Sequence, residues 1–263
     1  MHLSLHKLCG VLALVLQATA SAVVLDWDSV AWTPGSLSNS YDLDPTNPGN
    51  DITVTVSGST AQLIPDNTPP NAATPNIGTS MEGGLTPVQN ALLIYFDLTN
   101  TSQAITLSVS FSAQYTEGAT NVSFTIFDVD FGSSSYQDQL RNIFALGVDG
   151  VTQIAPTITT SSGNTLTGSG LTQVVNGTAN VANSGTGSGN GNVTISFGTN
   201  AISSFRFTYG SGSTAPANPN AQKIAIHDFS FTPVPEINPV WSAVASCIAA
   251  LGLVLRHRAN FRK

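Results

Sequence analysis

The segment at residues 104–112, AITLSVSFS, decides the fold of this chain. Every second residue from Ile105 to Phe111 is apolar, and the residues between them are Thr or Ser. Because neighbouring side chains of a β-strand point to opposite faces, this period of two predicts a strand with one buried and one polar face. The same alternation recurs in segments 121–129, 202–210 and 223–231. We therefore expect several antiparallel strands around one core.

Shorter apolar stretches predict further strands, and no segment between the two ends of the chain has the apolar stripe of a helix. These stretches are residues 52–56, 92–98, 143–148, 151–154 and 193–197. Asp149-Gly150 is typical of a two-residue hairpin turn. Segment 65–87 is predicted to be a loop, and segment 159–192 a long loop or an irregular hairpin. The sequence thus predicts an all-β fold, an antiparallel, jelly-roll-like β-sandwich of about ten strands at residues 23–233.

This predicted domain is strongly acidic. It holds fourteen acidic side chains and only three basic ones, Arg141, Arg206 and Lys223, so its net charge is close to −11. A surface of this sign repels phosphate backbones, which excludes a nucleic-acid-binding role. Cys9 and Cys247 both lie outside the domain. A disulfide, a thiolate zinc site and a cysteine nucleophile are therefore excluded within it.

The N-terminal segment has the organisation of a secretory signal. Lys7 precedes an apolar run at residues 8–16, and Ala20-Ser21-Ala22 follows with the small-x-small pattern that signal peptidase requires. This order predicts a signal peptide at residues 1–22, with an N-terminal signal helix and cleavage after Ala22.

The C-terminal segment, residues 234–263, combines three features. Pro235-Glu236 follows Val234, and the sixteen residues 240–255 carry no charge. Basic residues then dominate the tail at 256–263, beginning with Arg256, His257 and Arg258. The apolar run predicts a transmembrane helix, and the basic tail predicts that its far end stays in the cytoplasm.

The order of these three features resembles the PEP-CTERM sorting signal of Gram-negative bacteria. The matching residues are Val234, Pro235 and Glu236, the apolar run, and the basic stop at residues 256–258; the usual second proline after the glutamate is Ile237 here. The resemblance covers only the C-terminal segment. It implies recognition by an exosortase, a membrane cysteine peptidase, with transient anchoring in the inner membrane. It also implies a destination at the outer surface or in the extracellular matrix, in an exopolysaccharide or biofilm setting.

Three aspartates form the sharpest candidate site of the predicted domain. Asp128 and Asp130 lie two residues apart at the end of a predicted strand, and Asp138 follows after a Gly/Ser loop that can fold back. Residues two apart in a strand share a face, and closely spaced carboxylates are suitable calcium ligands. The three are therefore predicted to bind calcium, and no other cofactor is expected. The alternative is that Asp128 and Asp130 solubilise a strand end while Asp138 caps a turn.

The sequence of the predicted domain contains few residues that could form a catalytic site. His227 is the only histidine of the predicted domain and no Gly-x-Ser-x-Gly motif accompanies it, so it is expected on the solvent face of a late strand. Glu82 and Glu117 lie on predicted loops, and no carboxylate pair for glycoside hydrolysis can be singled out. Five aromatic residues could form a stacking platform for sugars: Trp27, Trp32, Tyr41, Tyr115 and Tyr136. The alternative is that the two tryptophans pack the first strand and the tyrosines are scattered.

These observations predict an exported, non-enzymatic surface or matrix protein, either structural or binding, that is associated with exopolysaccharide. Its expected partners are signal peptidase and an exosortase during export, then exopolysaccharide or other surface proteins. The alternative is a calcium-stabilised carbohydrate-binding module or adhesin. A secreted glycan hydrolase is the third possibility.

Overall fold

The computed structural model describes residues 21–44, 48–66, 72–181 and 189–235. These residues form seventeen strands and two short 3-10 helices, η1 (Thr60–Gln62) and η2 (Gly170–Thr172), without an α-helix. The first strand begins at Val23 and the last ends at Pro233. The predicted signal helix and the predicted transmembrane helix at 240–255 lie outside the described residues. Within those residues, no helix has the length and apolar character needed to cross a membrane.

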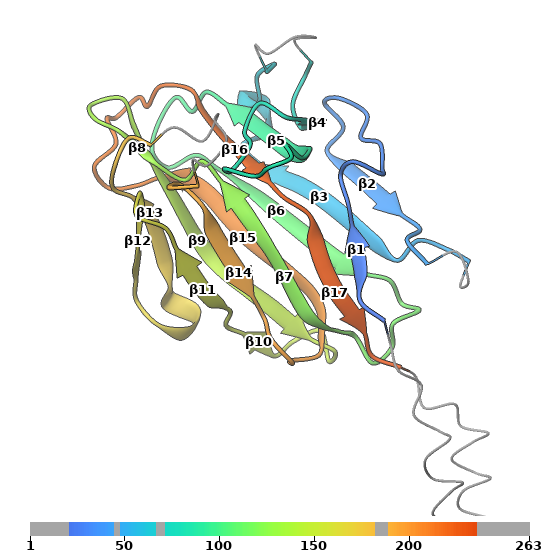
Figure 1. The fold of residues 1–263 in the computed structure, drawn as a ribbon. Helices are drawn as coiled ribbons and strands as arrows, with labels where there is room; N and C mark the ends of the chain where they lie inside the picture. Colours follow the sequence, from blue (N-terminus) through green and yellow to red (C-terminus); the bar gives the residue numbers. More distant parts are fainter. Residues whose placement is uncertain (1–20, 45–47, 67–71, 182–188, 236–263) are drawn as a thin grey trace, which may run out of the picture. The chain divides into compact units, whose positions relative to one another are not determined.

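One layer of the fold is built around β7 and is called the β7 sheet here (Figure 1). β7 pairs antiparallel with β14 on one edge and with β17 and β16 on the other. On the first side, β14 pairs in turn with β11. On the second side, β17 pairs with β1, β16 pairs with β5, and β5 pairs with β4. The strands of this sheet are β1 (Val23–Leu25), β4 (Asn76–Gly78), β5 (Ala91–Phe96), β7 (Ala119–Phe127), β11 (Thr157–Thr160), β14 (Val193–Ser196), β16 (Gln222–Ile226) and β17 (Phe229–Pro233).

The second layer is built around β15 and is called the β15 sheet. Its antiparallel order is β2-β3-β6-β15-β9-β13-β12, and β10 and β8 add to β9. The strands are β2 (Ser38–Tyr41), β3 (Ile52–Gly58), β6 (Ala104–Phe111), β8 (Phe131–Gly132), β9 (Tyr136–Gly147), β10 (Gln153–Ile154), β12 (Asn164–Thr167), β13 (Val174–Gly177) and β15 (Ile202–Ser211). The two layers join where Ile202 of β15 pairs with Ala119 of β7.

Phenylalanine rings from the two sheets meet in the core. Phe124 of β7 stacks on Phe205 of β15 with 4.9 Å between ring centroids, and Phe229 of β17 contacts both rings. All three side chains are buried. They lie on the apolar faces that the period-two pattern predicts, so the predicted all-β, antiparallel fold with an apolar interior between two sheet layers is confirmed. Its jelly-roll-like connectivity stays a prediction.

Short strands lie in both segments that lack a clear alternation. Segment 65–87, predicted to be a loop, contains β4, a strand of three residues that is too short to show the period of two. Segment 159–192, predicted to be a long loop or an irregular hairpin, contains the hairpin of β12 and β13, whose ladder pairs Asn164 with Gly177, so the hairpin alternative is confirmed. A turn at Asp149-Gly150 is confirmed: Gly150 has a φ of +68°, and the Asp149 carboxylate accepts hydrogen bonds from the N–H groups of Val151 and Thr152. It is not of the predicted two-residue kind, because β9 ends at Gly147, β10 begins at Gln153, and the Gly150 N–H donates to the Gly147 carbonyl.

Candidate functional site

A polar pocket of about 330 Å³ opens at one end of the two sheets, where β7 and β5 end and β9 and β16 begin. This is the end at which β8, β16 and β5 are labelled in Figure 1. Antiparallel strands bring these termini together although they are distant in the sequence. The pocket is lined by Asp66, Tyr95, Asp128, Asp130, Tyr136, Asp138, Ala221, Gln222 and Lys223. All three predicted aspartates therefore share one site.

Asp128 is the carboxylate that the pocket leaves most open to a ligand. It directly follows β7 with a φ of +66°, a left-handed conformation that costs most residues energy but that aspartate tolerates. No hydrogen bond to its side chain comes from the rest of the described chain. Burial, and then the nearby charge of Asp130, raise the pKa of the Asp128 carboxyl to about 7, although Lys223 acts in the opposite direction. A partner of positive charge would stabilise this carboxylate.

Asp130 and Asp138 are held by the protein itself. Both oxygens of the buried Asp138 carboxylate accept hydrogen bonds, one from the Tyr209 hydroxyl at 2.7 Å and one from the Asp130 N–H at 3.0 Å. The Val181 N–H donates to Asp130 at 3.2 Å, and the Tyr136 side chain also bonds to Asp130. Burial nevertheless raises the pKa of Asp130 and raises that of Asp138 well above its ordinary value. The pocket thus concentrates negative charge that the surrounding donors only partly stabilise.

Gly177 of β13 lets the chain at Asp130 approach closely. A Cβ atom at position 177 would overlap the Asp130 carbonyl group, so only glycine fits there. The Gln137 side-chain amide donates to the Gly177 carbonyl at 2.9 Å. The hairpin of β12 and β13 therefore helps to position the aspartates.

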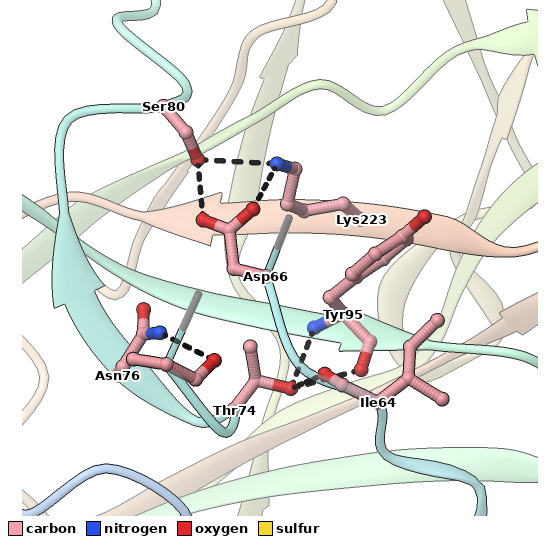
Figure 2. Close-up of polar contacts among 8 residues, drawn as sticks. Ile64, Asp66, Thr74, Asn76, Ser80, Tyr95 and Lys223 are labelled. Atoms are coloured by element: carbon pink, nitrogen blue, oxygen red, sulfur yellow. Dashed lines mark hydrogen bonds and ion pairs between the residues drawn. The ribbon is translucent and has the colours of Figure 1, made fainter. Parts of the chain in front are cut away.

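Asp66 and Lys223, which also line the pocket, form an ion pair (Figure 2). The Lys223 ammonium donates to Asp66 at 2.9 Å and to the Ser80 hydroxyl at 3.2 Å, and Ser80 donates to the second Asp66 oxygen. The ammonium also lies 5.4 Å from the centre of the Tyr95 ring. Thr74 ties this segment to β5, because its hydroxyl donates to the Tyr95 carbonyl and accepts from the Tyr95 N–H.

Gln222 also lines the pocket, and its side-chain amide is only partly explained by the fold. The residue is 3% exposed, yet neither its amide nitrogen nor its amide oxygen has a hydrogen-bond partner within the described residues. An unpaired buried polar group costs about 1–3 kcal/mol. A ligand that pairs with this amide would recover part of that cost.

The calcium prediction has only part of its geometry in place. The structure brings Asp128, Asp130 and Asp138 together, but the described residues contain no group of three Asp, Glu, His or Cys side chains arranged to hold a metal ion. Calcium needs six to eight oxygen ligands, whereas the oxygens of Asp138 are already engaged with protein donors. Calcium binding stays a prediction.

The sequence missed the partners that complete the pocket. Asp66 lies in a segment predicted to be a loop, and Gln222 and Lys223 begin a strand that showed only a hydrophobic pattern. No local signal links these residues to Asp128. Gln222 and Lys223 reach it through the pairing of β16 with β5 and β7, and Asp66 lies two residues after Ile64, whose N–H donates to the Tyr95 carbonyl of β5.

His227 is only partly exposed. Its side chain is 23% exposed and packs on the Phe127 ring at 5.3 Å, on a part of the β7 sheet where Met81 and Leu85 also pack against Phe127 and its neighbours. Its Nε2 atom lies 3.7 Å from the Asp228 carboxylate and makes no hydrogen bond within the described residues. The expected solvent-facing position is therefore found only in part.

The aromatic residues divide between core and pocket. Trp27 and Trp32 are buried and meet edge to face at 6.3 Å, so they pack the first strand as one of the two interpretations predicted. Tyr41 also contacts Trp27. Of the expected platform residues, Tyr136 alone lines the pocket, where Tyr95 joins it.

The export and sorting residues lie mostly beyond the described part of the chain. Ala22 is exposed and directly precedes β1, and Val234 follows β17 with its N–H donating to the Gly118 carbonyl at 2.9 Å. Pro235 is the last described residue. Residues outside the described ranges are Ala20, Glu236, Arg256, His257 and Arg258.

No protein-family model and no curated protein matches the sequence. Solved structures of low identity do match. One is a carbohydrate-binding module of family 28 specific for non-crystalline cellulose, at 12% identity, covering 59% of this chain and 78% of that one, with a TM-score of 0.34. Another is the family 11 module of Clostridium thermocellum with a mixed-linked tetrasaccharide, at 13% identity, covering 83% and 99%, with a TM-score of 0.32. A third is a Caldicellulosiruptor saccharolyticus family 27 module with mannohexaose, at 8% identity, covering 83% and 100%, with a TM-score of 0.39.

Proposed function

We propose that this chain is an exported, non-enzymatic glycan-binding module whose binding site is the pocket at Asp128. The observation that carries the proposal is that two groups line the same pocket: the open Asp128 carboxylate, and the Gln222 amide, which has no hydrogen-bond partner within the described residues. Sugars offer many hydroxyl groups in close succession, and carboxylates and amides are suited to pair with them. Tyr95 and Tyr136 add aromatic surface to the lining of the pocket.

The charge of the domain is compatible with this role. The only ammonium group among the described residues that line the pocket is that of Lys223, and it forms an ion pair with Asp66. The other charged side chains of the pocket are carboxylates, which accept hydrogen bonds. A polyhydroxylated ligand supplies donors. We therefore favour glycan binding over recognition of acidic ligands, which this surface would repel.

Glycan binding is expected to depend on Asp128. The purified full-length protein should bind a subset of an oligosaccharide array, and the Asp128→Asn variant should bind the same glycans about tenfold more weakly or not at all. Asp97→Asn is the matched control, because Asp97 is an exposed aspartate outside the pocket. No binding to any glycan would contradict the proposal, and turnover of a bound polysaccharide would favour a hydrolase instead.

The same array tests the calcium-stabilised alternative. Binding that persists in EDTA supports a pocket that needs no metal. Binding that is lost in EDTA and restored by calcium chloride supports the version in which Asp128, Asp130 and Asp138 hold calcium.

For localisation, we propose export by the signal at residues 1–22 and sorting by the PEP-CTERM-like segment at 234–263. The support is that the strands fill residues 23–233, so both signals can be removed without taking a strand from either sheet. Transient anchoring through residues 240–255, followed by processing near Pro235-Glu236, would release the module to the cell envelope or the extracellular matrix, in an exopolysaccharide setting.

Mass spectrometry of the intact protein recovered from the producing cells tests this route. The expected mass lacks residues 1–22 and the segment that follows Pro235-Glu236. A mass that retains the tail at 256–263 would contradict sorting and indicate a permanent membrane anchor. A mass that retains residues 1–22 would contradict signal cleavage.

A further inference from the structure

We propose that the pocket at Asp128 recognises the protonated amine of an amino sugar, so that its ligand is a deacetylated, cationic glycan. This inference rests on the glycan-binding function proposed above and names the class of sugar.

Negative charge in the pocket exceeds positive charge. Four carboxyl groups line it, and the single basic side chain there, Lys223, forms its ion pair with Asp66. The other two basic side chains of the described chain are committed elsewhere, Arg141 to the Gln139 side chain and Arg206 to the face of the Phe144 ring. Asp128, Asp130 and Asp138 consequently have no ion-pair partner within the described residues. A cationic ligand would supply the missing charge.

The Lys223 ammonium shows that this environment suits an amine. It is bound by a carboxylate, a hydroxyl and an aromatic ring within one wall of the pocket, and its side chain is 14% exposed. An ammonium group has three donors and no acceptor, so it is satisfied by this kind of surrounding. Asp128 and Tyr136 bring another carboxylate and another aromatic ring to the same pocket, and Asp128 forms no ion pair within the described residues.

Two acceptors in the pocket have no donor. The Asp128 carboxylate receives no hydrogen bond from the described residues, and the Gln222 amide oxygen is buried without a partner. The Gln222 amide nitrogen is unpaired as well, so a sugar hydroxyl beside the amine would have a donor to meet. A charged hydrogen bond of this kind is about twice as strong as a neutral one. The raised pKa of Asp128 is consistent with a carboxylate whose cation is absent.

A bound divalent metal ion is less suited to this geometry. Calcium would need several oxygens at 2.3–2.6 Å, roughly the distances found in protein calcium sites. The carboxylate oxygens of Asp138 and one oxygen of Asp130 already accept protein N–H or O–H groups. An amine requires only two or three acceptors at ordinary hydrogen-bond distance. The Asp128 oxygens can act as such acceptors without first losing a hydrogen bond from the described residues.

The test compares two oligosaccharides with the same backbone, a β-1,4-linked glucosamine oligomer and its fully N-acetylated counterpart. Calorimetric titration of the full-length protein near neutral pH should give at least about tenfold tighter binding of the glucosamine oligomer. Asp128→Asn should remove that preference, and Gln222→Leu should weaken binding of both oligomers. Asp97→Asn should change neither. The preference should persist at physiological ionic strength, because partly buried charge pairs are screened less than surface pairs.

The possible outcomes separate this inference from the proposed function. Equal or tighter binding of the N-acetylated oligomer, or of neutral glycans alone, overturns the amine inference and leaves glycan binding in place. Absence of binding to every glycan overturns both. If Asp128→Asn binds the glucosamine oligomer as tightly as the wild-type protein does, the binding comes from general attraction to the acidic surface. That result overturns the inference. Stoichiometric calcium binding that blocks the glucosamine oligomer assigns the site to calcium and overturns it as well.

Discussion

The Asp128→Asn variant is expected to be more stable than the wild-type protein at pH 8, by up to about 4 kcal/mol. The physical reason is that the pocket buries the Asp128 carboxylate beside Asp130 without a hydrogen-bond donor, which raises its pKa from 3.8 to about 7. Asparagine has nearly the same shape, carries no charge, and tolerates the left-handed backbone at this position. The full figure is an upper limit, because residual solvent in the pocket screens part of the charge.

The sign of the pH dependence follows from the same shift. The folded protein holds the Asp128 proton more tightly than the unfolded chain does, so stability is greatest below the ordinary pKa of 3.8 and is lost as pH rises toward about 7. The raised pKa values of Asp130 and Asp138 act in the same direction. Urea unfolding at a series of pH values should show wild-type stability falling across this window, with a shallower fall in Asp128→Asn.

The control for this experiment is Asp97→Asn, which removes an exposed carboxylate and should leave the profile unchanged. A wild-type stability that rises from pH 4 to pH 7 would contradict the description of the pocket. If the variant is more stable but binds glycan poorly, Asp128 is retained for binding at a cost in stability, as is common for functional sites. The increased stability would also show that the loss of binding does not come from unfolding.

The Phe205→Ala variant is expected to lose about 3–5 kcal/mol of unfolding free energy. Phe205 is 2% exposed and lies between the two sheets, where its ring contacts those of Phe111, Phe124, Phe197 and Phe229. Truncation therefore removes a large buried side chain and leaves a cavity that rigid neighbouring rings cannot fill. For a domain of this size the midpoint of thermal unfolding should fall by roughly 10 °C.

Phe144→Ala provides the matched control. Phe144 is half-buried on the outward-facing side of β9, where the Arg206 guanidinium lies 4.4 Å above its ring. Its truncation should cost about 1 kcal/mol, since it leaves no closed cavity. Equal losses in the two variants, measured by thermal unfolding followed by circular dichroism, would contradict a core formed between the two sheets.

Some of the acidic pocket was predictable because it depends on neighbours along the chain. Asp128 and Asp130 lie at the end of a clear strand, and Asp138 follows after a short loop, so their convergence was expected. Their buried environment was not. Segment 91–96 shows why: it is apolar at nearly every position because residues of the neighbouring loop, Met81 and Leu85, cover the outer face of the β7 sheet. Burial on both faces removes the period of two, and a single-sequence pattern then cannot tell which side faces the core.

Residues close together in the chain were enough to predict the fold class, the strands around Ile105, Phe124 and Phe205, and a turn at Asp149-Gly150. Alternating side chains choose the buried face of a strand, and a turn depends on a few consecutive residues. The surroundings of Asp128 depend on the tertiary structure. Gln222 reaches the pocket through the pairing of β16 with β5 and β7, and Asp66 lies two residues after Ile64, whose N–H donates to the Tyr95 carbonyl of β5. The charge balance and the unpaired amide of the pocket are properties of that assembly, and they do not exist in any single segment.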